Sequence, residues 1–170
     1  MCVYSKGGNN MGKYYAGLSF EQVVRKYAQN VNSVCFMRLQ NRADAEDCFQ
    51  NTFLKLFRKS PEFHDESHLK AWLLRVAINE CKNCIRDNRR HLPLDAATEQ
   101  PAPSVEDERD LSWALMAMPD DYREVLYLHY IEGYKIAEIA EILDSNRNTV
   151  KSKLRRGREL LKKGYGGEDK

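Results

Sequence analysis

Apolar residues recur at helical spacing along most of this chain, and no stretch alternates in the way that indicates a β-strand. In the first half, this spacing predicts a helix from Ser19, a helix from about Asn41 to the Ser60–Pro61 break, and a helix over about 67–90. Ser19 and Gln22 form a capping pattern at the first of these starts. Three long amphipathic helices in a row predict a helical bundle.

The second half predicts four shorter helices. One helix begins near Leu111 and ends at Pro119, the next begins near Tyr122 and closes at Gly133, and two more follow. Residues 91–104 hold three prolines and acidic residues without a helical stripe, which predicts a flexible acidic linker. The expected fold class is therefore all-α, with two small helical domains. Their expected bounds are 18–90 and 105–163, between a disordered segment 1–17 and a tail 164–170.

The last two helical patterns form the most informative part of the chain. Ile136, Ile139 and Leu143 share one face, and the polar break Asp144–Ser145–Asn146 can cap the helix that follows. From Arg147 to Lys163 there are eight Lys or Arg residues against one acid. The apolar face of the second helix comprises Val150, Leu154, Gly157 and Leu161, and the opposite face comprises Asn148, Lys151, Ser152 and Arg155. This pattern predicts a DNA-binding helix-turn-helix, although an ordinary helix pair with a solvated basic face would have a similar charge.

Composition and charge narrow the class of protein further. The net charge of +2 averages an acidic stretch, 95–110, and the basic last helix, which indicates a localised site for a polyanion. No apolar run approaches the roughly 20 residues that span a bilayer, and no signal peptide is apparent. We therefore expect a cytoplasmic protein with no membrane insertion, whose five cysteines are reduced.

Cys81 and Cys84 form a CxxC pair, but no second pair stands at zinc-ligand spacing. Both fall on the apolar arc of their helix, so packing in the core is favoured over a metal or redox role, and a redox role stays open. An enzyme with a Cys81–Cys84 dithiol is the alternative, but no α/β pattern surrounds the pair. We expect no metal, no cofactor and no catalytic residue.

The helix expected over 67–90 carries a second polar face. At about 100° per residue, one narrow arc holds a set of cations and amides, with Trp72 one turn before them. Cations bind phosphates, amides can read base edges and an aromatic ring can stack on an unpaired base, so this face is a candidate for nucleic acid. A solvated polar face with Trp72 packed at a helix end is the alternative. The arc comprises Arg75, Asn79, Lys82, Asn83, Arg86 and Arg90.

These motifs together resemble the bacterial RNA polymerase sigma factors of the extracytoplasmic-function class. DAEDCFQNTFLKLF at 44–57 is similar to the polymerase-binding segment of that family, and AWLLRVAINECKNCIRDNRR at 71–90 resembles its promoter-melting segment. The stretch 118–161 resembles its C-terminal promoter-reading domain. One departure is Asp144–Ser145–Asn146, where relatives more often carry a glycine near the turn.

The resemblance implies roles for three groups of residues. Docking on the clamp helices of core RNA polymerase would use Asp44, Asp47, Gln50, Asn51 and Leu54. Engagement of the minus-ten element would use Ser67, His68, Lys70, Trp72, Arg75, Asn79, Lys82 and Asn83, with Arg86 and Arg90 on phosphates. Reading of the minus-thirty-five element would use Arg147, Asn148, Thr149, Lys151, Ser152, Arg155 and Arg156.

The resemblance thus implies an alternative sigma factor that binds core RNA polymerase and directs promoter-specific initiation and promoter melting. It also implies promoter DNA and an inhibitory anti-sigma factor as partners. The alternative function is a stand-alone helix-turn-helix regulator, which would use only the C-terminal module. That alternative leaves the polar face at 75–90 and the outward-facing Leu54 without a purpose.

Overall fold

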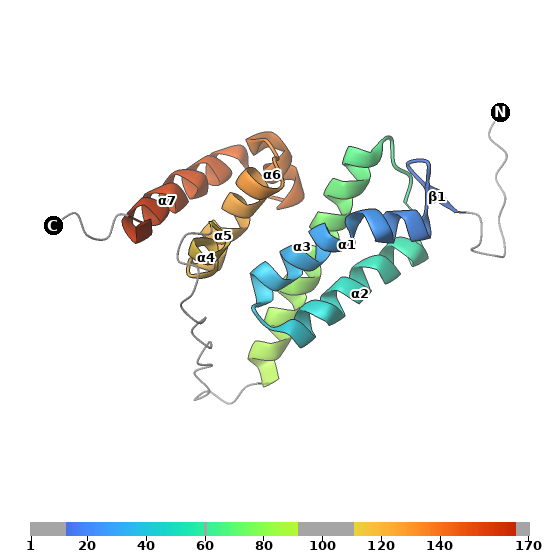
Figure 1. Ribbon diagram of the computed structural model, residues 1–170, viewed down its shortest axis with the longest axis horizontal. Helices are drawn as coiled ribbons and strands as arrows, with labels where there is room; N and C mark the ends of the chain where they lie inside the picture. Colours follow the sequence, from blue (N-terminus) through green and yellow to red (C-terminus); the bar gives the residue numbers. More distant parts are fainter. Residues whose placement is uncertain (1–12, 60, 92–110, 166–170) are drawn as a thin grey trace.

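The computed structural model describes residues 13–59, 61–91 and 111–165. Three segments lie outside the described residues: residues 1–12, nearly all of the expected linker 91–104, and the end of the tail. Within the described residues the chain forms an N-terminal bundle, 13–91, and a C-terminal bundle, 111–165, which lie side by side (Figure 1). The predicted all-α class with two helical domains is confirmed.

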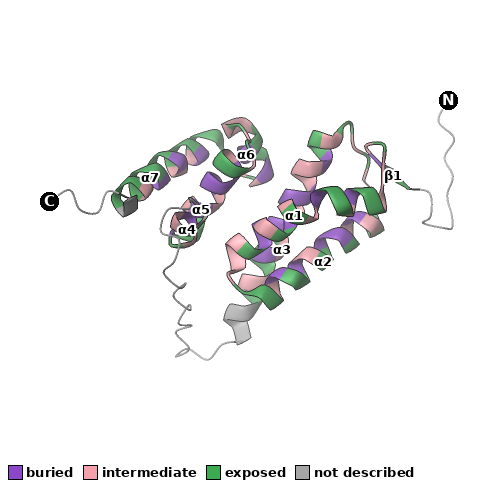
Figure 2. Cartoon of the chain, in the orientation of Figure 1, coloured by how far each residue is buried: buried purple, intermediate pink, exposed green. Residues whose placement is uncertain are grey.

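Three long helices build the N-terminal bundle, and each packs against the other two. They are α1 (Phe20–Leu39), α2 (Arg42–Lys59) and α3 (Glu66–His91). The capping pattern at the start of α1 is formed as predicted, because Ser19 Oγ accepts from Gln22 N at 3.3 Å and Gln22 Oε1 accepts from Ser19 N at 2.8 Å. Burial follows the apolar stripes, with exposed residues on the outer faces (Figure 2).

A short β-hairpin precedes α1, where disorder up to residue 17 was predicted. Strands β1 (Tyr14–Tyr15) and β2 (Leu18–Ser19) pair antiparallel, with Tyr15 opposite Leu18. Ala16 and Gly17 turn the chain at positive φ, 50° and 84°. The prediction was wrong for 13–17, since strands of two residues are too short to show an alternating pattern.

Tyr15 anchors this hairpin on the bundle. Its side chain is only 1% exposed, and its ring lies 6.3 Å from the ring of Phe20 and 6.4 Å from that of Phe63. The Tyr15 hydroxyl is buried without a hydrogen-bond partner among the described residues. Burial of an unpaired hydroxyl lowers stability. The Tyr15 ring therefore stabilises the packing of the hairpin on the bundle, and the Tyr15 hydroxyl destabilises it.

We expect Tyr15→Phe to raise the free energy of unfolding by about 1 kcal/mol, because it removes an unpaired polar atom and keeps the ring. Urea denaturation followed by circular dichroism measures the change. Tyr27→Phe is the matched comparison, because the Tyr27 hydroxyl donates to Glu66 Oε2 at 2.9 Å. Loss of that hydrogen bond should lower the free energy of unfolding. Equal losses in the two variants would show that the Tyr15 hydroxyl has a partner.

The C-terminal bundle consists of short helices. They are α4 (Leu111–Met116), α5 (Asp120–Leu126), the π-helix η2 (Tyr127–Ile131), α6 (Ile136–Ile142) and α7 (Arg147–Tyr165). Pro119 separates α4 from α5, and Gly133 at φ 77° ends η2, both as the sequence predicts. The π-helix itself was not predicted, because its five residues are far fewer than the window over which a helical period can be measured.

The approach of α7 to α5 depends on one glycine. A Cβ atom at Gly157 would lie 2.8 Å from Leu126 Cδ1 and 3.1 Å from Leu126 Cγ. Gly157, Val150 and Leu154 are buried, so the predicted apolar face of α7 is the face that packs. The opposite face of α7 is therefore left for solvent or a ligand.

Candidate functional site

The cationic face of α7 is the first part of the site. Arg147, Asn148, Lys151, Ser152, Arg155 and Arg156 are exposed, and Thr149 is half-buried. Arg155 pairs only loosely with Glu159, with 3.8 Å between Arg155 Nη1 and Glu159 Oε1. The seven residues that the resemblance implied for DNA therefore lie on the first half of one helix, where cations and amides can meet a groove of DNA.

The turn before α7 fixes where that helix begins. Asn146 Oδ1 accepts from Thr149 N at 2.7 Å, which confirms that the polar break can cap the helix. Asp144 takes the left-handed conformation, with φ 51°, that a glycine would adopt more easily. Ser145 N then donates to Ala140 O at 2.8 Å and closes α6. The departure from the family pattern is thus accommodated by an aspartate in the conformation that the turn requires.

A hollow beside α7 adds residues that the sequence did not single out. It is formed where the start of α5 meets the first half of α7, and Lys153 Nζ bonds Asp121 Oδ1 across it at 3.1 Å. Its lining comprises Asp121, Tyr122, Asn146, Asn148, Thr149, Ser152, Lys153 and Arg156. The acid at its rim makes Lys153 less available for phosphate than its neighbours on α7.

The polar face of α3 is the second part of the site. Exposed residues of this face comprise Ser67, His68, Arg75, Asn79, Lys82, Asn83 and Arg86. Lys70 and Trp72 are half-buried, and the side chain of Arg90 lies outside the described residues. The core side of α3 holds Leu69, Leu73, Ala77 and Cys81, and Cys84, which was expected on the apolar arc, is only half-buried.

Aromatic rings gather at the start of α3. Phe63, which the sequence did not single out, lies with its ring 5.7 Å from Trp72 and 5.4 Å from His68, in both cases edge-on. Because Phe63 also touches Tyr15, the hairpin supports the loop that leads into α3. Trp72 therefore packs against Phe63, in part as the alternative of a packed Trp72 expects, and it is half-buried.

The outward face of α2 is the third part. Asp47, Gln50, Asn51 and Arg58 are exposed, and Leu54 is 46% exposed among them. Asp44 is half-buried near the start of the helix, where its N–H donates to Asn41 Oδ1 at 3.1 Å. An exposed leucine within a polar rim is typical of a protein contact. This face lies on a different helix from both cationic faces.

Comparison with known proteins agrees with this arrangement. The family model "Sigma-70 region 2" matches residues 23–91, and "Sigma-70, region 4" matches residues 109–161. The chain is 30% identical to the ECF RNA polymerase sigma-E factor of Haemophilus influenzae, over 84% of this chain and 85% of that protein. This chain belongs to the ECF sigma factors of RNA polymerase. It is an alternative sigma factor that directs promoter-specific initiation of transcription.

Further similarities extend over most of this sigma factor. It is 29% identical to the ECF RNA polymerase sigma factor SigW of Bacillus subtilis, over 85% of this chain and 88% of that protein. Among solved structures it resembles the sigma factor RpoE of Bartonella quintana in complex with the anti-sigma factor NepR. That match has a TM-score of 0.70 and 25% identity, over 88% of this chain and 98% of the other.

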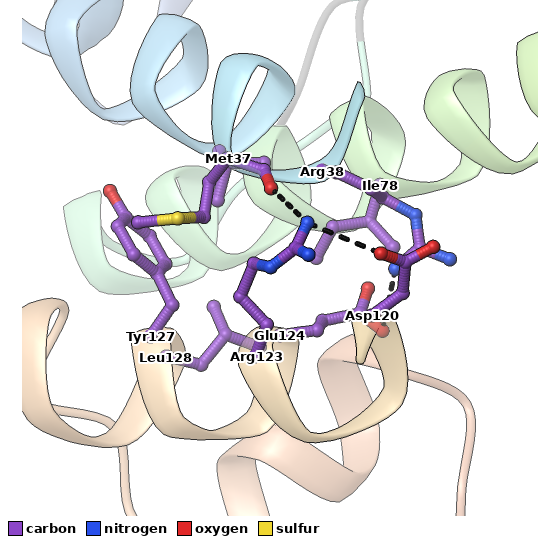
Figure 3. Close-up of a pocket in the computed structure, with 9 residues that line it drawn as sticks. Met37, Arg38, Ile78, Asp120, Arg123, Glu124, Tyr127 and Leu128 are labelled. Carbon is purple, nitrogen blue, oxygen red and sulfur yellow. Dashed lines mark hydrogen bonds and ion pairs between the residues drawn. The ribbon is translucent and has the colours of Figure 1, made fainter. Parts of the chain in front are cut away.

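Where the two bundles of the sigma factor meet, charged side chains are largely shielded from water. Arg38 Nη1 on α1 lies 2.9 Å from Glu124 Oε2 on α5, and the two side chains are only 14% and 12% exposed. Arg123, 5% exposed, donates through Nη1 to Met37 O at 2.8 Å (Figure 3). Burial lowers the pKa of Arg123, and Asp120 opposes that effect.

The cysteines that the structure describes lie in the N-terminal bundle, and they are Cys35, Cys48, Cys81 and Cys84. Cys81 is buried, as predicted, and Cys84 is half-buried. The neighbouring Cys81 thiol and burial raise the pKa of Cys48, and the Cys35 thiol and burial do the same for Cys81. Burial raises the pKa of Cys84 to about 11. Protonated thiols are poor nucleophiles, which disfavours a redox role.

Among the described residues, no group of three or more His, Cys, Asp or Glu side chains is placed to hold a metal ion. In the same ranges, every helix is too short or too polar to cross a membrane.

Proposed function

We propose that the three surfaces divide the work of this sigma factor. The cationic face of α7 reads the minus-thirty-five element in the major groove, through base edges and phosphates. The polar face of α3, with Trp72 at its edge, binds the minus-ten element as its strands separate. The outward face of α2 docks on core RNA polymerase. The observation that carries this proposal is the placement of two exposed cationic faces on separate bundles, with the Leu54 face apart from both.

Partners and chemistry follow from the same division. The sigma factor binds and positions DNA, and core RNA polymerase makes the phosphodiester bonds, so no residue of this chain is assigned to catalysis. It acts in the cytoplasm, where RNA polymerase and promoter DNA are located. An anti-sigma factor is an expected partner, supported by the Bartonella quintana relative, whose structure contains one.

A stand-alone regulator is the weaker explanation. It would need only the C-terminal bundle, yet the sigma region 2 model matches 23–91, which covers the whole of α2 and α3. A pull-down with core RNA polymerase separates the two functions, because a stand-alone regulator would not be retained. Run-off transcription on a promoter library then identifies the sequences that the sigma factor selects.

We expect Leu54→Lys to weaken binding to core RNA polymerase by about 30-fold or more, as for a contact at the centre of an interface. The measurement is a titration of labelled core enzyme with the full-length sigma factor. Leu160→Lys is the matched control, because Leu160 is 39% exposed but lies on α7. Equal loss in both variants would show that the α2 face is not the docking surface.

A further inference from the structure

The hairpin that precedes α1 exposes one aromatic ring and buries the next. Tyr14 is 72% exposed, more than any other large apolar side chain in the described ranges, whereas Tyr15 is 1% exposed. Successive side chains of a strand point to opposite faces, so burial of the Tyr15 ring turns the Tyr14 ring towards solvent. Tyr14 therefore contributes little to the core, and its ring is available to a ligand.

The backbone that carries Tyr14 is fixed on both sides. Tyr14 pairs with Ser19 across the hairpin, and Ser19 is the N-cap of α1. Tyr15 packs the hairpin against Phe20 of α1 and against Phe63 in the loop before α3. A ring on a fixed backbone has less conformational freedom to lose when it binds a ligand. The hairpin thus presents Tyr14 in a form that is ready for stacking.

A continuous run of aromatic rings joins the hairpin to the α3 face. The centroid of the Tyr15 ring lies 6.4 Å from that of Phe63, and the centroid of the Phe63 ring lies 5.7 Å from that of Trp72. Two ring-to-ring contacts therefore connect the anchor of the hairpin to Trp72. Modules that bind single strands cover about 4–16 nucleotides and stack successive bases on aromatic side chains. A strand that reaches Trp72 is accordingly long enough to reach the hairpin as well.

The place of the hairpin on the bundle determines which part of a promoter strand it can meet. Trp72 lies near the N-terminal end of α3, and Arg86, which is proposed to hold a phosphate, lies near the other end. The hairpin lies at the end of the bundle where α3 begins, on the side away from the C-terminal bundle (Figure 1). A strand that runs along α3 from Arg86 to Trp72 therefore meets the hairpin next.

We propose that the hairpin is a second stacking site for the melted strand, in which Tyr14 holds an unpaired base beyond the base at Trp72. The proposal rests on the proposed role of α3 in binding the minus-ten element, and it extends that surface to the hairpin. Every base has a flat face, so Tyr14 selects an unpaired strand and not a particular sequence. Each base held outside the duplex opposes closing of the strands, so Tyr14 prolongs the life of the open complex.

Photo-crosslinking identifies what contacts the hairpin in the open complex. The photoreactive residue p-benzoylphenylalanine, in place of Tyr14, keeps a ring at this position and links to its neighbour on irradiation. In the polymerase holoenzyme on a duplex promoter, we expect residue 14 to link to the melted strand, a few nucleotides from the link made by the same residue in place of Trp72. The matched control replaces Tyr130, which is 47% exposed on η2 of the other bundle, and it should leave the melted strand unlinked.

The outcomes separate this inference from the proposed function. If residue 72 links to the melted strand and residue 14 does not, the stacking site on the hairpin is refuted and the role of α3 stands. If residue 14 links to a polymerase subunit and not to DNA, the exposed ring is a protein contact and the inference is refuted as well. If neither residue links to the strand, the role of α3 at the minus-ten element fails, and the inference fails with it.

The lifetime of the open complex provides a second test. Tyr14→Ala should shorten the lifetime in the presence of a heparin competitor by about 5- to 50-fold, within the range for losing one stacked base. Tyr14→Phe keeps the face of the ring and should keep the wild-type lifetime. Thermal unfolding of the free chain should be the same in all three proteins, because the Tyr14 side chain is exposed. A wild-type lifetime in Tyr14→Ala would overturn the proposal.

Discussion

Arg123→Ala is expected to lower the free energy of unfolding of the C-terminal bundle by about 3–5 kcal/mol, the range for losing one partner of a buried charged network. Arg123 Nε donates to Leu115 O at 2.9 Å, and Nη2 donates to Met118 O at 2.5 Å and Met116 O at 3.1 Å. These carbonyls lie at the end of α4, which has only six residues. One guanidinium therefore satisfies the end of a helix too short to be stable alone.

Urea denaturation followed by circular dichroism tests this expectation. Arg123→Lys should recover little of the lost free energy of unfolding, because an ammonium group cannot reproduce the planar guanidinium that donates to several carbonyls. Arg25→Ala is the control, since Arg25 pairs with Glu21 on an exposed surface and should cost less than about 0.5 kcal/mol. A loss at Arg123 no larger than at Arg25 would mean that water replaces the guanidinium without cost.

Several helix boundaries of this chain were predictable because each has a local signal. Ser19 and Gln22 mark the start of α1, Pro119 separates α4 from α5, and Gly133 ends η2. The face of α7 was predictable as well, since Val150, Leu154 and Gly157 pack at the expected spacing and leave the cations outside. In both cases the physical cause lies within a few residues of its effect.

What the sequence did not predict depends on residues distant along the chain. Lys70 meets Glu132, and Arg38 meets Glu124, across the contact between the bundles. Helical periodicity places Lys70 near a polar face but cannot show that an acid from another bundle covers it. The sequence therefore predicted which side chains share a polar face of α3, but not that several of them contact the other bundle.

Trp72→Ala is expected to slow formation of the open promoter complex by about 10- to 100-fold, the range for losing one base-stacking contact. Trp72 is half-buried at the start of the α3 face, and the centroid of its ring lies 5.7 Å from that of Phe63. A ring fixed in this way can receive an unpaired base without first losing its own freedom of motion. Stacking acts only after the strands part, so binding of the polymerase holoenzyme to closed duplex DNA should change little.

Permanganate footprinting of the melted strand, with the polymerase holoenzyme on duplex templates, measures the rate of opening. Trp72→Phe keeps an aromatic face and should retain most of the wild-type rate of opening. Trp72→Leu keeps only apolar bulk, so its rate should resemble that of the alanine variant. Templates with a pre-melted minus-ten element remove the unpairing step and should narrow the defect. An undiminished defect on such templates would place Trp72 in packing alone, because a structural loss does not depend on whether the strands are already apart.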